Sequence, residues 1–209
     1  MNLPLPPVYP ITDRRLAGTD HAAQVRALAS AGARFIQLRE KELPDDQLYS
    51  EARSALEAAV DAGVTLIIND RVDLAIALNA PGVHLGQADL PPDSTRKLLG
   101  PEAIIGFSTH NIDQVREALK MPIDYLAFGP IYPTSTKDDP DPVTGIELLR
   151  EVREIAESIP VVAIGGITRS NICDVLAAGA VSAAIIGDLY IDSDPAAAYS
   201  ELIKNVTQC

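Results

Sequence analysis

Short apolar runs that alternate with helix-like segments extend along the whole chain, and this pattern restricts the fold more than any other feature of the sequence. Eight of the runs have the length and composition of buried strands, at residues 8–11, 34–38, 65–68, 82–85, 104–107, 125–128, 161–164 and 183–186. The segments between them repeat apolar residues at helical spacing, and a glycine stands where several of these helices should end: Gly32, Gly63, Gly100 and Gly179. Strands that alternate with helices in this way indicate a parallel sheet.

The number and size of the repeating units favour a closed barrel over an open sheet. Eight units in 209 residues give about 26 residues per unit, close to the lower end of the (β/α)8 range. An open doubly wound sheet is the alternative, and it usually carries a glycine-rich loop after its first strand. Here that strand is followed by Thr12, Asp13, Arg14 and Arg15. We therefore predict an α/β fold, a single (β/α)8 TIM barrel in which residues 1–209 form one catalytic domain.

Charge and composition exclude several classes of partner. A net charge of −12 argues against binding along a nucleic-acid backbone, which needs a basic surface. No apolar run approaches the roughly 20 residues that span a membrane, and residues 1–7 lack the basic and apolar regions of a signal peptide. The two cysteines, Cys173 and Cys209, have no metal-type spacing, which argues against a disulfide framework and favours a reducing cytoplasm. We expect small-molecule substrates, no nucleic-acid or membrane partner, and an oligomeric state that the sequence leaves open, a homodimer included.

Polar residues directly follow the apolar runs, and the carboxyl ends of parallel barrel strands meet at one mouth. Gln37, Arg39 and Lys41 lie at the end of the second run and share one face, because side chains alternate along a strand. Two cations that point toward a barrel interior require anions beside them. A bound polyphosphate is our preferred interpretation, and an ion pair at the barrel rim is the alternative.

Oxygen-bearing side chains follow the next two runs. Asn69 and Asp70 end the third run, and Asp89 comes shortly after the fourth. Two carboxylates and an amide at a barrel mouth suit Mg²⁺, which is often held by one or two carboxylates together with substrate phosphate. Alternatively, Asp70 caps the helix that begins near Val72.

Ser108 follows the fifth run and can donate its hydroxyl to the same anion as Arg39 and Lys41. Thr134, Ser135, Thr136 and Lys137 follow the sixth run and form a hydroxyl-rich, phosphate-binding loop. The glycines after the last two runs predict a second anion site. Gly165 and Gly166 follow the seventh run and Gly187 ends the eighth, where barrels commonly bind phosphate on backbone N–H groups. Residues 138–144, directly after Lys137, are placed to form a lid, with an ordinary acidic surface loop as the alternative.

The sequence contains no recognisable catalytic dyad. His84 is expected at the rim or in the core, and His110 near a helix start. The inventory favours the positioning of two phosphorylated groups and the stabilisation of a departing anion over covalent catalysis.

Six motifs at consecutive strand ends resemble one known family, the thiamine-phosphate synthases. The resemblance covers residues 9–194, and its motifs are Gln37-Leu38-Arg39-Glu40-Lys41, Asn69-Asp70-Arg71, His84-Leu85-Gly86-Gln87-x-Asp89, Gly106-Phe107-Ser108-Thr109-His110, Gly129-Pro130-Ile131-Tyr132-Pro133-Thr134-x-Thr136-Lys137 and Ala163-Ile164-Gly165-Gly166-Ile167. Each motif alone is modest, whereas six in order are specific.

The resemblance implies a Mg²⁺-dependent transferase that joins hydroxymethylpyrimidine diphosphate to hydroxyethylthiazole phosphate and releases pyrophosphate by a dissociative mechanism. By this analogy Lys137, Arg39 and Ser108 are catalytic, and Asp70 and Asp89 hold the metal. The pyrimidine diphosphate would be held by Gln37, Arg39, Lys41, Asn69, Ser108 and Lys137. The thiazole phosphate would be held by Thr134, Ser135, Thr136, Gly166, Ile186 and Gly187.

Two departures from the family pattern concern the thiazole-phosphate site. Gly187 stands where the family often has serine, and Asp188 follows it, where a carboxylate would repel a phosphate unless it turns away. The alternatives are a thiazole tautomerase, which tends to carry histidine where Pro130 stands, a sugar-phosphate isomerase or aldolase barrel, and a non-catalytic regulatory barrel. The intact basic and metal motifs favour the synthase.

Overall fold

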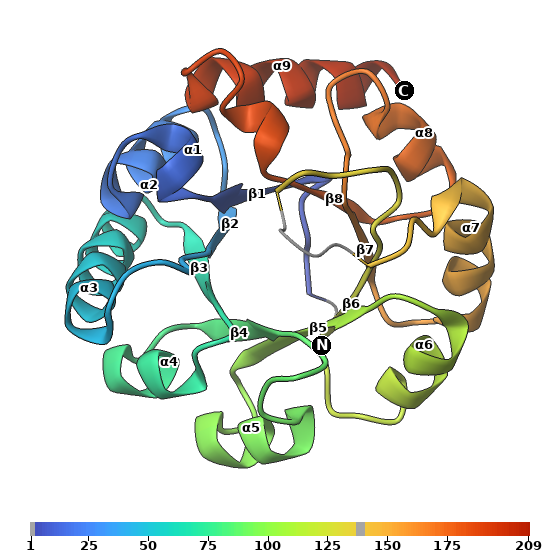
Figure 1. Cartoon of the computed structure of the whole chain (residues 1–209), viewed down its shortest axis with the longest axis horizontal. Helices are drawn as coiled ribbons and strands as arrows, with labels where there is room; N and C mark the ends of the chain where they lie inside the picture. The colour runs from blue at the N-terminus through green and yellow to red at the C-terminus, as the bar shows by residue number, and fades with distance from the viewer. Residues whose placement is uncertain (1–2, 137–140) are drawn as a thin grey trace.

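The chain forms a closed parallel β-barrel surrounded by helices (Figure 1), and the computed structural model describes residues 3–136 and 141–209. The strands follow one another around the barrel in sequence order: β1 Val8–Thr12, β2 Phe35–Leu38, β3 Thr65–Asn69, β4 Gly82–Leu85, β5 Ile104–Thr109, β6 Tyr125–Phe128, β7 Val161–Ile164 and β8 Ser182–Ile185. Parallel pairing of β1 with β8, Tyr9 opposite Ala184, closes the ring. The predicted (β/α)8 barrel is confirmed, and the open-sheet alternative is wrong.

Helices follow the strands and form the outer layer. They are α1 Arg14–Ala17, α2 His21–Ser30, α3 Asp45–Asp61, α4 Val72–Leu78, α5 Pro92–Leu99, α6 Ile112–Ala118, α7 Gly145–Ile155, α8 Ile172–Ala177 and α9 Pro195–Gln208, with a 3-10 turn η1 Gly187–Leu189 after β8. The predicted strand boundaries agree with the observed ones to within two residues, because buried parallel strands are apolar on both faces and stand out in the sequence. None of the helices in the described part of the chain is long and apolar enough to cross a membrane.

Alternating side chains on each strand separate an outer core from an inner one. Outward residues such as Val8 pack against the helices, and inward residues such as Tyr9 fill the barrel. The inner core contains Leu5, Tyr9, Ile11, Phe35, Ile67, Tyr125, Ala127, Val162 and Ala184. Leu5 comes from the segment before β1, so this segment packs against the barrel interior at the end opposite the strands' carboxyl ends.

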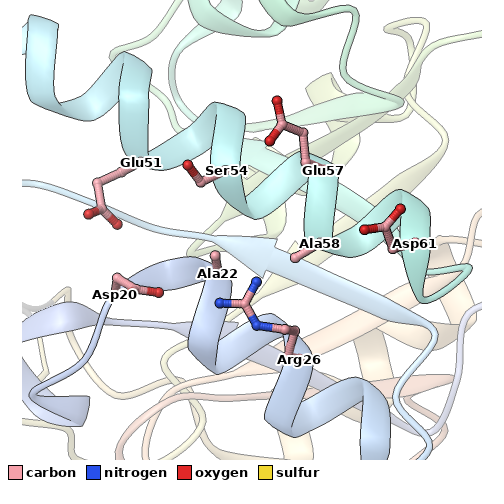
Figure 2. Close-up of a pocket in the computed structure, with 8 residues that line it drawn as sticks. All are labelled: Asp20, Ala22, Arg26, Glu51, Ser54, Glu57, Ala58 and Asp61. Carbon is pink, nitrogen blue, oxygen red and sulfur yellow. The ribbon is translucent and has the colours of Figure 1, made fainter.

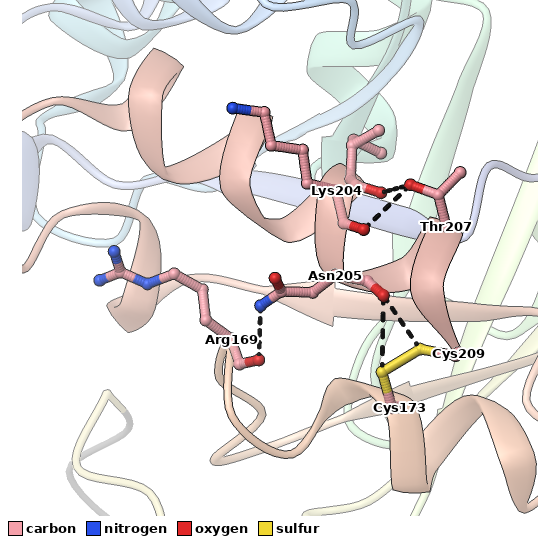
Figure 3. Close-up of a disulfide and its surroundings, with 7 residues drawn as sticks. Arg169, Cys173, Lys204, Asn205, Thr207 and Cys209 are labelled. Atoms are coloured by element: carbon pink, nitrogen blue, oxygen red, sulfur yellow. Dashed lines mark hydrogen bonds between the residues drawn. A yellow bond between two sulfur atoms is a disulfide. The ribbon is translucent and has the colours of Figure 1, made fainter.

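A disulfide joins Cys173 of α8 to Cys209, the residue after α9 (Figure 3). The expectation that the two cysteines form no disulfide is therefore wrong. The two helices pack side by side, and this contact brings together residues that are 36 positions apart in the sequence. Spacing between cysteines carries no signal for such a pair, because only the packing of α8 against α9 decides it.

Candidate active site

The predicted site residues that the structure describes lie at or just beyond the carboxyl ends of their strands. Arg39 and Lys41 follow β2, Asp70 follows β3 and Asp89 follows β4. Because all eight strands are parallel, these ends form one mouth of the barrel. Lys137 and residues 138–140 lie outside the described residues.

Both cations after β2 are paired with carboxylates. Arg39 Nη1 donates to Asp13 Oδ2 at 3.1 Å, and Asp13 Oδ1 caps α1 by accepting from the Leu16 N–H. The Lys41 ammonium donates to Asp70 while its own side chain is about half exposed, at 53%. The rim ion pairs weighed as an alternative are thus present in the structure. Binding of a polyphosphate to the same two cations remains a prediction.

Asp70 and Asp89 face each other across the ends of β3 and β4. Their carboxylates lie within hydrogen-bonding range, and Asp89 Oδ2 also accepts from the Gly86 N–H at 2.7 Å. Burial raises the pKa of Asp89 most, the adjacent Asp70 carboxylate adds to the rise, and the Gly86 amide and the Lys41 ammonium oppose it. Two carboxylates this close repel each other when both are charged, and a cation between them would relieve that repulsion.

The backbone at Asp70 fixes the direction of its side chain. Asp70 has a left-handed φ of 62°, which is uncommon for residues other than glycine, and its N–H donates to the His84 carbonyl at 2.7 Å. Within the described residues the N-cap of α4 is Arg71 and it makes no side-chain cap bond, so the N-cap alternative for Asp70 is wrong. Instead the Asp70 carboxylate points to Lys41 and Asp89.

The donor set fits Mg²⁺ only if water and substrate complete it. Among residues 3–136 and 141–209 no group of three or more His, Cys, Asp or Glu side chains could hold a metal. Two carboxylates from neighbouring strands suffice for an ion that keeps several waters and binds phosphate oxygens. Asn69 ends β3 directly before Asp70 and is opposite His84 in the strand register.

A hydrogen-bonded network inside the barrel joins two predicted substrate-binding residues. Gln37 Nε2 donates to the Tyr9 hydroxyl at 3.2 Å, and the Tyr9 and Tyr125 hydroxyls are 3.1 Å apart. The Tyr125 hydroxyl lies 2.9 Å from His84 Nδ1, and His84 Nε2 lies 2.8 Å from Ser108 Oγ. We call these five residues the interior network. Sequence analysis expected His84 at the rim or in the core without giving it a role, and it missed the two tyrosines. The inward parity of Tyr9, His84 and Tyr125 was a usable signal.

Burial controls the charge state of the interior network. It lowers the pKa of His84 to about 4, against a weaker opposing effect of Asp70, so the imidazole is neutral at neutral pH. Burial also raises the pKa of Tyr9 and Tyr125 well above the usual range, so both phenols keep their protons. The interior network is therefore uncharged, and each contact is an ordinary hydrogen bond.

Replacement of Gly106 by alanine should damage this network. A methyl group at Gly106 would lie 2.1 Å from the Tyr125 ring and 2.5 Å from His84 Nδ1, far inside contact distance. We expect a loss of about 1–3 kcal/mol in the free energy of unfolding, as for other overpacked cores, measured by urea denaturation. Unchanged stability, with Tyr125 and His84 unmoved in a crystal structure of the variant, would contradict the prediction.

The loops after β6, β7 and β8 meet at the other side of the mouth. The loop after β6 crosses inward over the barrel (Figure 1), and a methyl group at Gly187 would lie 3.6 Å from Thr136 Oγ1. Gly166 has a φ of 61°, and a methyl group there would lie 2.4 Å from the Pro133 carbonyl oxygen. The Thr134 and Thr136 hydroxyls are 3.4 Å apart. This half of the mouth thus combines hydroxyls with glycines that permit close backbone approach.

Ser135 and Ile186 complete the predicted thiazole-phosphate set. Ser135 is exposed on the loop after β6, and Ile186 lies between β8 and η1, next to Gly187. Asp188 is paired with Arg169: its Oδ2 accepts from the Arg169 N–H at 3.1 Å and from Arg169 Nε at 2.9 Å. The repulsion that a carboxylate here would exert on a phosphate is therefore relieved by a cation.

The described part of the predicted lid is tied to β5 and β6. His110 Nδ1 lies 2.6 Å from the Gly129 carbonyl, and His110 Nε2 lies 3.5 Å from Asp141 Oδ2. The Thr144 N–H donates to the Pro130 carbonyl at 2.8 Å. Residues 138–140 lie outside the described residues, so the choice between a lid and a surface loop stays a prediction.

A groove of about 420 Å³ lies on the outer surface, between α2 and α3 (Figure 2). Arg26 from α2 and the carboxylates of Glu51, Glu57 and Asp61 from α3 line it, together with Asp20. None of the predicted site residues contributes to it. The chemistry-bearing groups gather at the barrel mouth instead.

The fold and the mouth define a (β/α)8-barrel protein, a class whose sites lie at the carboxyl ends of the strands and frequently bind phosphate. Within this class the chain belongs to the thiamine monophosphate synthase family, whose sequence model matches residues 8–189. It is 45% identical over 195 residues to a thiamine-phosphate synthase of Koribacter versatilis, covering 91% of this chain and 92% of that one. It is 43% identical to a thiamine-phosphate synthase of Moorella thermoacetica, covering 95% and 94%. The solved thiamine phosphate pyrophosphorylase of Pyrococcus furiosus superposes with a TM-score of 0.86 at 36% identity, covering 96% and 95%.

Proposed function

We propose that this chain is a Mg²⁺-dependent thiamine-phosphate synthase. It transfers the hydroxymethylpyrimidine group from its diphosphate to hydroxyethylthiazole phosphate and releases pyrophosphate. The observation that carries the proposal is the close carboxylate pair Asp70 and Asp89 beside Lys41, at the same barrel mouth as Arg39. Family membership supports the transferase activity and its place in thiamine biosynthesis.

In this reaction pyrophosphate leaves as an anion, so the site needs groups that stabilise negative charge more than it needs a general base. The bond between the pyrimidine methylene carbon and the diphosphate oxygen breaks, and its electron pair leaves with pyrophosphate. The thiazole nitrogen then supplies the pair for the new carbon–nitrogen bond. Arg39, Lys41 and Lys137 stabilise the charge that develops on pyrophosphate, since preorganised cations act most strongly where charge appears.

The remaining residues position the two substrates. Gln37, Asn69 and Ser108 orient the pyrimidine diphosphate, and Asp70 and Asp89 hold Mg²⁺. The bound ion would supply further charge stabilisation on the diphosphate oxygens. The thiazole phosphate is held by the other half of the mouth: Thr134, Ser135, Thr136, Gly166, Ile186 and Gly187.

The wider setting follows from the same proposal. The whole chain acts as a single catalytic domain on small molecules, with no nucleic-acid or membrane partner, and a homodimer is compatible with it. A biosynthetic role fits the cytoplasm. The disulfide between Cys173 and Cys209 is unusual for a cytoplasmic protein, because disulfides are rare in reducing compartments.

The direct test is incubation of the purified chain with both substrates and Mg²⁺, followed by chromatographic detection of thiamine phosphate. Product and pyrophosphate should appear in equal amounts, and chelation of the metal should stop both. Folded protein that yields no product would reject the synthase and favour a tautomerase or a regulatory barrel.

Lys137→Ala should weaken binding of the pyrimidine diphosphate and slow turnover. A single ammonium–phosphate hydrogen bond contributes about 1.5–3 kcal/mol, so we expect kcat/KM to fall roughly 10- to 100-fold. Lys120→Ala is the matched control, because Lys120 pairs with Glu117 on the exposed surface. Steady-state kinetics with saturating thiazole phosphate measure the effect, and equal kcat/KM values in both variants would remove Lys137 from the site.

A further inference from the structure

The interior network can be fully hydrogen-bonded in only two ways. Each hydroxyl has one proton, and a neutral imidazole has one donor and one acceptor nitrogen. If the Gln37 amide donates to Tyr9, then Tyr9 must donate to Tyr125. Tyr125 then donates to His84 Nδ1, and His84 Nε2 donates to Ser108. Turning the Gln37 amide over exchanges every donor and acceptor. A mixture leaves either a buried contact without a proton or a buried hydroxyl proton without an acceptor, and both are unfavourable.

The two arrangements present opposite patterns to the mouth. In the structure Nε2 of Gln37 faces Tyr9, so Oε1 remains to accept a hydrogen bond. At the other end the Ser108 hydroxyl accepts from His84, so its own proton remains to be donated. An aminopyrimidine carries an amino donor beside a ring-nitrogen acceptor, which complements one acceptor and one donor on the protein.

We propose that Tyr9, Tyr125 and His84 are positioning residues that fix this pattern and so make the mouth select an aminopyrimidine over a pyrimidinone. The inference rests on the proposed function, because that function places a pyrimidine between Gln37 and Ser108. In a pyrimidinone a carbonyl oxygen and a ring N–H replace the amino group and the ring nitrogen, which exchanges donor and acceptor. Binding of the pyrimidinone then requires the whole network to reverse or to break.

The packing around the interior network supports this role. Tyr9 and Tyr125 are each at most 1% exposed, so bulk water does not satisfy their hydroxyls. The His84 and Tyr125 rings stack with centroids 5.5 Å apart, and Gly106 leaves the space that both rings occupy. Phenylalanine would fill the two tyrosine positions equally well and has no polar group that needs a partner. We therefore assign the two hydroxyls the role of linking Gln37 to Ser108 by hydrogen bonds.

The test compares the affinity of the full chain for two diphosphates, that of the aminopyrimidine and that of the corresponding pyrimidinone. Titration calorimetry in Mg²⁺ without thiazole phosphate measures both. Tyr125→Phe and Tyr9→Phe each remove one network hydroxyl and keep the ring. Tyr199→Phe is the matched control, because Tyr199 is buried on α9 in the outer core. We expect wild type and Tyr199→Phe to prefer the aminopyrimidine, and both network variants to lose at least about tenfold of that preference.

The ratio of the two affinities decides the inference, since a merely structural change would weaken both ligands alike. An unchanged ratio in Tyr125→Phe, or a wild type that binds both diphosphates equally, would overturn it. If circular dichroism shows that Tyr125→Phe is unfolded, the ratio in Tyr9→Phe decides. A failure of the proposed function alone would give a different result. Wild type would still prefer the aminopyrimidine diphosphate but would form no thiamine phosphate once thiazole phosphate is added. A wild type that binds neither diphosphate would overturn both.

Discussion

Asp89→Asn should reduce Mg²⁺-dependent turnover by about 100-fold or more and, at the same time, stabilise the metal-free protein at neutral pH. The loss of turnover follows because the variant removes one of the two carboxylates proposed to hold the metal, and a bound ion would contribute several kcal/mol of charge stabilisation. The gain in stability follows because the Asp70 and Asp89 carboxylates repel each other when no cation lies between them. An activity loss combined with a stability gain is the signature of a site built for a ligand.

The direction of the pKa shift sets the pH at which the stability gain appears. The pKa of Asp89 is raised in the folded state by burial and by Asp70, so the folded protein holds that proton more tightly than the unfolded chain does. The resulting stabilisation is complete below the unfolded pKa of about 4 and is lost as the pH rises through the folded value. Asparagine is uncharged throughout. The variant should therefore have the higher melting temperature at neutral pH, and the difference should disappear in acid.

Asp93→Asn provides the control for Asp89→Asn. Asp93 is an exposed carboxylate in the first turn of α5 and is four positions away in the sequence. It should change neither turnover nor its dependence on Mg²⁺. Thermal unfolding in chelator and steady-state rates across a Mg²⁺ titration measure both effects. Wild-type turnover in Asp89→Asn would remove this carboxylate from the metal site.

The barrel and its mouth were predictable because both depend on information carried by single segments. Each strand is apolar on both faces, and polar residues such as Arg39 and Asp70 appear directly at its end. Once the strands are known to be parallel, these ends must meet. The pairing of Arg39 with Asp13 was not predictable, since it depends on how the loops after β1 and β2 approach each other.

The interior network shows where single segments stop being informative. Parity alone places His84, Gly106 and Tyr125 on the inner faces of β4, β5 and β6. Their hydrogen bonds depend on the register that sets His84 opposite Gly106 and Gly106 opposite Tyr125. Likewise, Asp188 is neutralised by Arg169 from the loop before α8, a contact that no local pattern contains. Such partners follow from the closed barrel and not from any one of its units.

Opening the disulfide between Cys173 and Cys209 should lower the free energy of unfolding by about 3–4 kcal/mol. The bond closes a loop with a sequence separation of 36, and the chain-entropy estimate for a loop of this length gives that value. For a chain of this size the loss corresponds to a fall in melting temperature on the order of 10 °C. Guanidinium denaturation of oxidised and reduced protein measures the difference. A thiol assay on protein purified without reductant should detect free thiols only after reduction.

Cys173→Ser separates the effect of the bond from that of the reductant. The variant should match reduced wild type in stability and should not respond to reductant. The rest of α9 should remain in place, because Arg169 pairs with Glu201 at 2.8 Å. In addition, Asn205 Nδ2 donates to the Arg169 carbonyl at 2.9 Å (Figure 3). Arg169 also pairs with Asp188, which directly follows Gly187. The KM for the thiazole phosphate should therefore stay the same when the disulfide opens. A large rise in that KM on reduction would instead mean that the disulfide itself holds η1 in position.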